Sequence, residues 1–116
     1  MAREKYQTLT EQMFYILLCL CRECCGTDIM EAVREMTQGR VIIGPGTLYT
    51  LLDTFHKDGI IEETRVEGRK RSYRITAAGH HRLEQETMRL RAQLQDFERW
   101  KGDANAHAQE DSTGEL

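Results

Sequence analysis

One stretch of the chain, IIGPGTLYTLLDTFHKDGII at residues 42–61, limits the possible folds most strongly, because it holds the only proline. Proline lacks a backbone N–H and is best tolerated in the first turn of a helix, so Pro45 predicts a helix start. Apolar residues follow at helical spacing until Asp58-Gly59. The first turn, however, carries small and hydroxyl side chains. The pattern indicates a helix whose N-terminal end a partner can approach closely.

A first helix pattern lies near the N-terminus. Either Thr8 or Thr10 can cap this helix. Its expected core face consists of Met13, Ile16, Leu17, Leu20 and Cys24. We expect Gly26 to end the helix, because glycine is a frequent helix terminator.

A second, shorter helix is expected to follow. Thr27 or Asp28 can cap it, and Gln38-Gly39 ends it. Its apolar residues are Ile29, Val33 and Met36. The segment RVII at residues 40–43 is rich in β-branched side chains and predicts a small additional strand.

A hairpin and a long helix are predicted after residue 59. The runs IIEETRV and RKRSYRI flank Glu67-Gly68, which is a hairpin signal. Thr76 and Gly79 mark the opening of the final helix. An apolar seam of heptad type runs along this helix through Leu83, Thr87, Leu90, Leu94 and Phe97, with Trp100 just beyond. From Gly102 the chain is small, polar and acidic, which predicts disorder.

The predicted order of elements is helix, helix, helix, hairpin and long helix, which is the order of a winged helix-turn-helix. We therefore expect a mainly α fold with a small β-hairpin (α+β), in which a winged helix-turn-helix domain precedes a long C-terminal dimerisation helix. The expected boundaries are 1–75 for the DNA-binding domain, 76–101 for the dimerisation helix and 102–116 for a disordered acidic tail.

Length and composition narrow the class of protein. A chain of 116 residues allows one domain with a modest core. The apolar run Met13–Leu20 is too short to span a bilayer, and the N-terminus lacks the apolar stretch of a secretory signal. We expect a cytoplasmic protein that has no membrane partner.

The net charge of −3 averages over unlike segments. Residues 102–116 hold four of the 19 acidic residues and no Lys or Arg, which leaves 16 basic and 15 acidic residues in the rest of the chain. Residues 65–74 contain five basic residues and one acidic residue. Such a local basic patch decides where phosphates bind. The cations at the hairpin tip can straddle a DNA backbone or reach a minor groove, and they are Arg69, Lys70 and Arg71.

The third helix suits DNA recognition, because one face can be buried while its N-terminal side chains stay free. The residues expected to be buried are Leu48, Leu51, Leu52 and Phe55. Those left free are Thr47, Tyr49, Thr50 and Thr54. Gly44 and Gly46 remove side chains where a sugar-phosphate backbone would pass, and the N–H groups of the first turn can hold a phosphate. The alternative is an ordinary turn in which Tyr49 is a half-buried packing residue.

Three segments of the chain resemble the PadR family of bacterial transcriptional regulators: LTEQMFYILLCL, GRVIIGPGTLYTLLDTFHKDGIIEE and RKRSYRITAAGHHRLEQE. The resemblance implies a winged helix-turn-helix homodimer that binds operator DNA, usually as a repressor released by a small molecule. It places in the recognition helix Gly46, Thr47, Tyr49 and Thr50. It places in the wing Arg69, Lys70 and Arg71. One departure is visible, since the family often opens the second helix with His-Gly-Tyr and this chain has Cys25-Gly26-Thr27.

The single C-terminal helix is similar to that of the smaller PadR subgroup, in which this helix dimerises. Its apolar seam would be a large exposed patch in a monomer, which is rare in soluble proteins. The expected dimer interface consists of Phe14, Leu18, Leu83, Leu90, Leu94, Phe97 and Trp100. Two Trp100 side chains near a dyad would suit a flat aromatic effector, although Trp100 can also serve packing alone.

Four cysteines lie within Cys19–Cys25. Free thiols in the cytoplasm fill cores well, and redox sensing and metal binding are the alternatives. A helical segment would not bring all four to one ion, so we expect no metal and no cofactor. No nucleophile, base or nucleotide-binding motif indicates an enzyme. Two other readings stay open: a winged-helix module that binds a protein, and a regulator that responds to thiol oxidation through this cluster.

Overall fold

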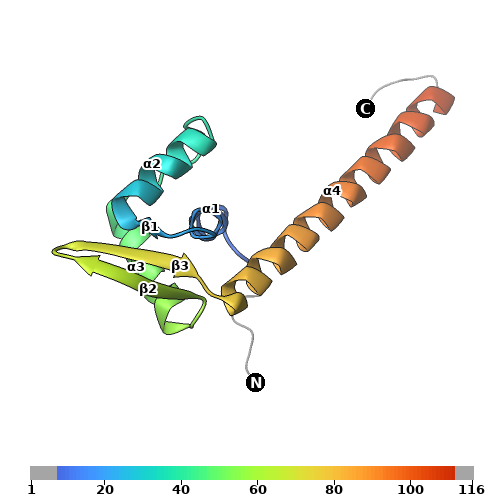
Figure 1. The fold of residues 1–116 in the computed structure, drawn as a ribbon. Helices are drawn as coiled ribbons and strands as arrows, with labels where there is room; N and C mark the ends of the chain where they lie inside the picture. Colours follow the sequence, from blue (N-terminus) through green and yellow to red (C-terminus); the bar gives the residue numbers. More distant parts are fainter. Residues whose placement is uncertain (1–7, 112–116) are drawn as a thin grey trace. The chain divides into compact units, whose positions relative to one another are not determined.

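The structure is a computed structural model that describes the backbone of residues 8–111 and the side chains of residues 8–105. Within this part, four helices and three strands form a winged helix-turn-helix followed by a long helix (Figure 1). The helices are α1 Glu11–Cys19, α2 Gly26–Met36, α3 Pro45–Lys57 and α4 Ala77–Asp111. The strands are β1 Cys24–Cys25, β2 Ile61–Glu67 and β3 Lys70–Ile75. The predicted fold class is confirmed.

The chain divides into two compact units. The first comprises the described residues up to Glu86, and the second begins at Thr87 within α4. All four helices and the two longer strands contribute to the core of the first unit. This core consists of Leu9, Ile16, Leu17, Leu20, Ile29, Val33, Val41, Ile43, Leu48, Leu52, Phe55, Ile60, Ile61, Ile75 and Leu83. None of the described helices is both long and apolar enough to cross a membrane.

The sheet contains one strand more than the predicted hairpin. Its strand order is β1-β3-β2, and both pairs are antiparallel. The hairpin of β2 and β3 is confirmed, and Gly68 at its turn has a φ of 64°, a conformation that glycine adopts without strain. The added strand β1 pairs Cys24 with Tyr73 and Cys25 with Ser72. The cysteine segment is therefore attached to the wing.

The first helix is shorter than predicted. Thr10 is its N-cap and accepts a hydrogen bond from the Met13 N–H at 3.1 Å, but the helix ends at Cys19 instead of Gly26. Cys24 is thus in a strand and does not belong to the core face of a helix. Helix α2 likewise begins at Gly26 with Cys25 as its N-cap, and not at Thr27 or Asp28. The physical reason is the pairing with β3, which takes up the backbone groups of residues 24 and 25.

The connection from α2 to α3 does not contain the strand predicted at residues 40–43. Thr37, which is buried, takes the place of a strand partner. Its hydroxyl donates to the Val33 carbonyl at 2.8 Å and accepts from the Val41 N–H at 3.1 Å. Val41 and Ile43 are buried in the core, so their β-branched side chains serve packing without a ladder. The predicted end of α2 at Gln38-Gly39 is confirmed, since both residues have positive φ.

The beginning of α4 is fixed against the corner between α3 and β2. The Thr76 hydroxyl donates to the Gly59 carbonyl at 2.8 Å and accepts from the Gly79 N–H at 3.2 Å. The Thr76 N–H donates to the Ile60 carbonyl at 3.0 Å. A Cβ at Gly79 would overlap the Ile60 carbonyl oxygen and lie 2.7 Å from Ile75 Cγ1. The Thr-x-x-Gly sequence therefore combines a helix cap with a close backbone approach.

The rest of α4 differs from the prediction in two respects. Leu83 is 5% exposed and belongs to the core of the first unit, so it is not free for a dimer interface. Glu86 is also buried there and accepts a hydrogen bond from the Leu9 N–H at 3.1 Å. The helix continues to Asp111, so the disorder predicted from residue 102 is wrong for residues 102–111, whose alanines favour a helix. Residues 112–116 lie outside the described part.

Candidate nucleic-acid interface

Helix α3 has the buried and exposed faces expected of a recognition helix. Gly44 is its N-cap and Pro45 its first residue. Its buried side chains are Leu48, Leu52 and Phe55, while Leu51 is half-buried at the edge of the core. Gly46, Thr47 and Thr50 are exposed, and Tyr49 is 46% exposed. Four of the predicted DNA-binding residues thus lie together on the first turns of α3.

No steric constraint within the described part of the protein requires glycine at residues 44 and 46, at the start of α3. A Cβ added at Gly44 or Gly46 would meet no atom within 4 Å. Their φ angles lie outside the positive region that favours glycine. A larger side chain would therefore fit at either position in the free protein.

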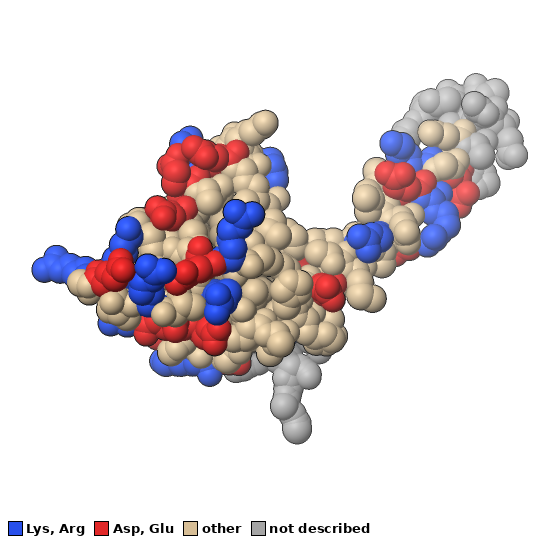
Figure 2. Space-filling view, in the orientation of Figure 1, with Lys and Arg blue, Asp and Glu red and all other residues tan. Residues whose placement is uncertain are grey.

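The wing carries both signs of charge. Figure 2 shows Lys and Arg side chains at the end of the β2–β3 hairpin, with acidic side chains next to them. Arg71 forms an ion pair with Glu63 at 2.9 Å, and Arg74 one with Glu62 at 3.5 Å. The other two predicted wing cations are Arg69 and Lys70. Neither forms an ion pair with any of the described residues. These two positive charges are free to meet a phosphate.

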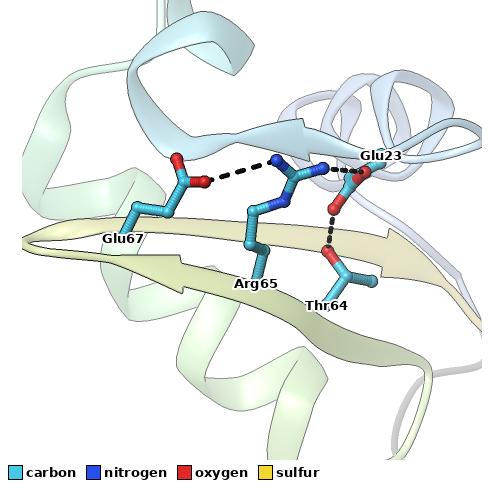
Figure 3. A network of polar contacts seen from close by, with 4 residues as sticks. All are labelled: Glu23, Thr64, Arg65 and Glu67. Carbon is cyan, nitrogen blue, oxygen red and sulfur yellow. Dashed lines mark hydrogen bonds and ion pairs between the residues drawn. The ribbon is translucent and has the colours of Figure 1, made fainter.

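Arg65 is held by carboxylates on both sides (Figure 3). Its guanidinium lies 3.5 Å from Glu23 and 3.4 Å from Glu67. The Thr64 hydroxyl donates to the second oxygen of Glu23 at 2.5 Å. This hydrogen bond, with help from Arg65 and Arg74, lowers the pKa of Glu23 below its ordinary value. The loop before β1 is in this way joined to the face of β2.

The cysteine cluster does not form a metal site in the described part of the chain, where no group of three or more His, Cys, Asp or Glu side chains is arranged to hold an ion. Burial, with smaller contributions from Cys24 and Cys21, raises the pKa of the Cys19 thiol to about 11. Burial also raises the pKa of Cys24. Because the thiolate is the reactive form, both thiols are weak nucleophiles at neutral pH. Cys21 is exposed and Cys25 is buried.

The second unit carries the apolar stripe of α4. The exposed fractions are 42% for Leu90, 57% for Leu94, 52% for Phe97 and 61% for Trp100. The rings of Phe97 and Trp100 are stacked, with centroids 6.1 Å apart and planes 24° apart. The Lys101 ammonium lies 5.8 Å from the centre of the Phe97 ring. On α1, Leu18 is 36% exposed and Phe14 is half-buried.

Two contributors to this region were not predicted. Glu23 and Thr64 fix the wing to the loop before β1, although they are far apart in the sequence. Gly26 contacts Tyr49, because a Cβ at residue 26 would lie 2.7 Å from the Tyr49 hydroxyl oxygen. Neither contact has a local sequence signal, since both depend on how distant elements pack. The Cys25-Gly26-Thr27 departure from the family pattern marked the right place without indicating the contact.

Comparisons with known proteins agree with this geometry. The sequence model described as "Transcriptional regulator PadR-like family" matches residues 16–85. A transcriptional regulator from Clostridium thermocellum has a similar structure, with a TM-score of 0.67 and 25% identity over 74% of this chain and 88% of that one. The chain matched no curated protein by sequence.

Two archaeal structures share the fold at lower identity. A putative transcriptional regulator from Thermoplasma acidophilum has a TM-score of 0.58 and 24% identity, over 78% of this chain and 88% of that one. RosR of H. salinarum has a TM-score of 0.59 and 22% identity, over 90% of this chain and 96% of that one. The family match covers more than half of the chain and includes α2, α3 and the whole hairpin. The chain therefore belongs to the PadR-like family of transcriptional regulators.

Proposed function

We propose that the protein is a homodimeric repressor that binds an inverted-repeat operator through α3 and the tip of the β2–β3 hairpin. The observation that carries the proposal is the open space around Gly44 and Gly46. No neighbouring atom requires glycine at these positions, and its small size lets a sugar-phosphate backbone approach the start of α3 closely. The uncapped N–H groups of that first turn then point at the phosphate.

The remaining DNA contacts divide into two kinds. Thr47, Tyr49 and Thr50 are exposed on α3 and can reach base edges in a major groove. Arg69 and Lys70 can bind phosphates without giving up an ion pair, whereas Arg71 would have to leave Glu63. Base contacts determine sequence preference and phosphate contacts determine general affinity. A regulator that works on chromosomal DNA in this way acts in the cytoplasm of a prokaryotic cell and needs no catalytic residue.

The apolar stripe of α4 supports the dimer. Four large side chains are exposed on it, namely Leu90, Leu94, Phe97 and Trp100. Burying one such side chain stabilises an assembly by roughly 1.5–3 kcal/mol, so the four on each chain can drive association. A second copy of α4 offers the same apolar surface, which is the self-complementary pairing of a two-fold interface. Leu18 and Phe14 on α1 are the other residues proposed for the dimer interface.

A flat aromatic molecule is the proposed effector. The stacked rings of Phe97 and Trp100 offer a planar apolar face, and both side chains are more than half exposed. Aromatic rings of a ligand can stack on such a face. Binding between the two copies would change the distance between the two α3 helices and release the operator.

The DNA-binding proposal is tested with a labelled duplex from the region upstream of the protein's own coding sequence and a scrambled duplex of the same composition. We expect a preference for the first at moderate salt. Arg69→Ala with Lys70→Ala should weaken binding to both duplexes and flatten the salt dependence. Thr47→Ala or Thr50→Ala should change the preference instead. Equal binding of both duplexes by the wild type would refute the proposal, and binding of neither duplex would favour a winged helix that binds a protein.

The dimer is tested separately by analytical ultracentrifugation. Leu94→Glu places a charge in the stripe and should dissociate the dimer, because a buried unpaired carboxylate costs several kcal/mol. Gln95→Glu is the matched control, because Gln95 is exposed beside Leu94 and the substitution adds the same charge outside the stripe. The control should remain dimeric. A dimeric Leu94→Glu variant would place the interface elsewhere.

A further inference from the structure

The ring of Tyr49 lies against the start of α2. Gly26, the first residue of α2, is buried, and a Cβ added to it would lie 2.7 Å from the Tyr49 hydroxyl oxygen. The same Cβ would lie 2.8 Å from Cε1 and 3.0 Å from Cζ of that ring. Real Cβ atoms do not approach other atoms this closely. Any side chain at residue 26 would therefore displace Tyr49 from its position.

Glycine at residue 26 is not required by the backbone. Gly26 is not among the residues with positive φ, and its N-cap Cys25 is in extended conformation like an ordinary helix start. Alanine would be the better helix former at this place. The three atoms nearest to a Cβ at this position all belong to Tyr49, so this ring is the first neighbour that a larger side chain would disturb.

Tyr49 also lies close to the wing. Burial raises the pKa of the Tyr73 hydroxyl, and the charges of Glu63 and, to a smaller extent, Tyr49 raise it further. Tyr73 is in β3, where it pairs with Cys24 of β1 just before α2 begins. The phenol ring of Tyr49 is therefore placed where α2, α3 and β3 come together. A shift of this ring therefore moves a side chain of the predicted DNA-binding surface.

We propose that Gly26 is a positioning residue for DNA recognition, because its bare backbone is the surface that orients Tyr49 on α3. The proposal rests on the proposed function. Tyr49 is 46% exposed, and the hydroxyl end of its ring lies against Gly26. A side chain that is already held in one orientation loses less conformational entropy when it binds. Gly26 would thus contribute to affinity without touching DNA.

The test is a double-mutant cycle of Gly26→Ala and Tyr49→Ala, measured by fluorescence anisotropy with the upstream and scrambled duplexes. Gly26→Ala alone should weaken binding of the upstream duplex by about three- to tenfold, which is the equilibrium cost of an off-rotamer ring. In the Tyr49→Ala background the same substitution should change binding by less than about twofold. In the Tyr49→Phe background the ring remains, so Gly26→Ala should still weaken binding. Gly102→Ala, which meets no atom within 4 Å, is the matched control for a helical Gly→Ala change.

Chemical denaturation of each variant separates orientation from loss of folding. If the Gly26→Ala single variant does not fold, folding of the Gly26→Ala, Tyr49→Ala double variant establishes the contact between residues 26 and 49. In that case the affinities of Tyr49→Phe and Tyr49→Ala for the upstream duplex measure the role of the ring in DNA binding. Two results would overturn this inference and leave the proposed function standing, provided that the wild type binds the upstream duplex. One is a Gly26→Ala variant with wild-type affinity. The other is a loss of affinity from Gly26→Ala that is as large in the Tyr49→Ala background as in the wild type. A wild type that binds neither duplex would overturn both.

Discussion

The substitution Gly79→Ala should be the most damaging change of a glycine to alanine in the described part of the chain. Its Cβ would overlap the Ile60 carbonyl oxygen and lie 2.7 Å from Ile75 Cγ1 and 3.0 Å from the Ile60 carbonyl carbon. The oxygen belongs to the backbone and is also the acceptor of the Thr76 N–H, so it cannot rotate away. The helix must move instead, and the helix start then loses its hydrogen bond to Ile60.

The expected cost follows from these contacts. Overpacking in a core costs about 1–3 kcal/mol, and an overlap with backbone belongs at the upper end. Loss of the Thr76 hydrogen bond adds about 1 kcal/mol, while the better helix propensity of alanine returns roughly 0.5–1 kcal/mol. We expect a net loss of about 3 kcal/mol, which lowers Tm by about 12–24 °C in a domain of this size.

Urea denaturation followed by circular dichroism measures this loss directly. Gly102→Ala is the control, because its Cβ meets no atom within 4 Å and it lies in the same helix. The control should be neutral or stabilising by up to about 1 kcal/mol. If Gly79→Ala unfolds at the same urea concentration as the wild type, the close approach of α4 to Ile60 is not present in solution.

Three further outcomes are expected. Thr10→Ala removes the side-chain cap of α1 and should lower the free energy of unfolding by about 1 kcal/mol in urea; an unchanged midpoint would show that the cap is not formed. The pKa of Glu23 in the folded protein lies below its ordinary value of 4.5, so the stability that Glu23 contributes is complete above pH 4.5 and is lost as the pH falls through the lower folded pKa. Glu23→Gln should remove this part of the pH dependence. Urea denaturation at a series of acidic pH values measures it. Near neutral pH, iodoacetamide should modify exposed Cys21 well before Cys19, because the pKa of Cys19 is about 11. Peptide mass spectrometry measures the two rates. Equal rates would contradict the burial of Cys19 and would favour the thiol-switch alternative.

The elements that the sequence predicted well are those with local physical causes. Pro45 has a fixed φ and no N–H, so it marks a helix start wherever the chain folds. Gly68 at a hairpin turn and Thr76 at a helix cap act within a few residues of themselves. These signals were sufficient for the element order, the hairpin and the recognition helix. They do not depend on what the rest of the chain does.

The elements that were missed depend on distant partners. Cys24 and Cys25 have the pattern of a helix end, and only their pairing with Tyr73 and Ser72 makes them a strand. Leu83 and Leu90 occupy the same predicted seam, yet the first is in the core of its own unit and the second is exposed. Periodicity shows that a residue is on an apolar face, but it cannot show which surface covers that face.

The candidate site shows the same division. Gly46, Thr47 and Thr50 were predicted from the local pattern of α3, and the structure places them on its exposed first turns. The basic wing was also predicted, but the pairing of its arginines was not. Arg65 is held by Glu23 from a separate loop, and a count of charges along residues 65–74 contains no information about that loop.

The paired arginines have a consequence for how the proposed operator binding responds to salt. Binding of DNA gains free energy by releasing condensed counterions, roughly one for each phosphate that a cation neutralises. Arg65, Arg71 and Arg74 already have carboxylates within 4 Å, so in the free protein these acidic groups act as tethered counterions. An arginine that exchanges a carboxylate for a phosphate leaves that carboxylate unpaired, which offsets part of the gain in free energy. We therefore expect these three arginines to add little to affinity for DNA of any sequence, so that discrimination in the proposed complex depends on the first turn of α3, where two glycines leave the approach open.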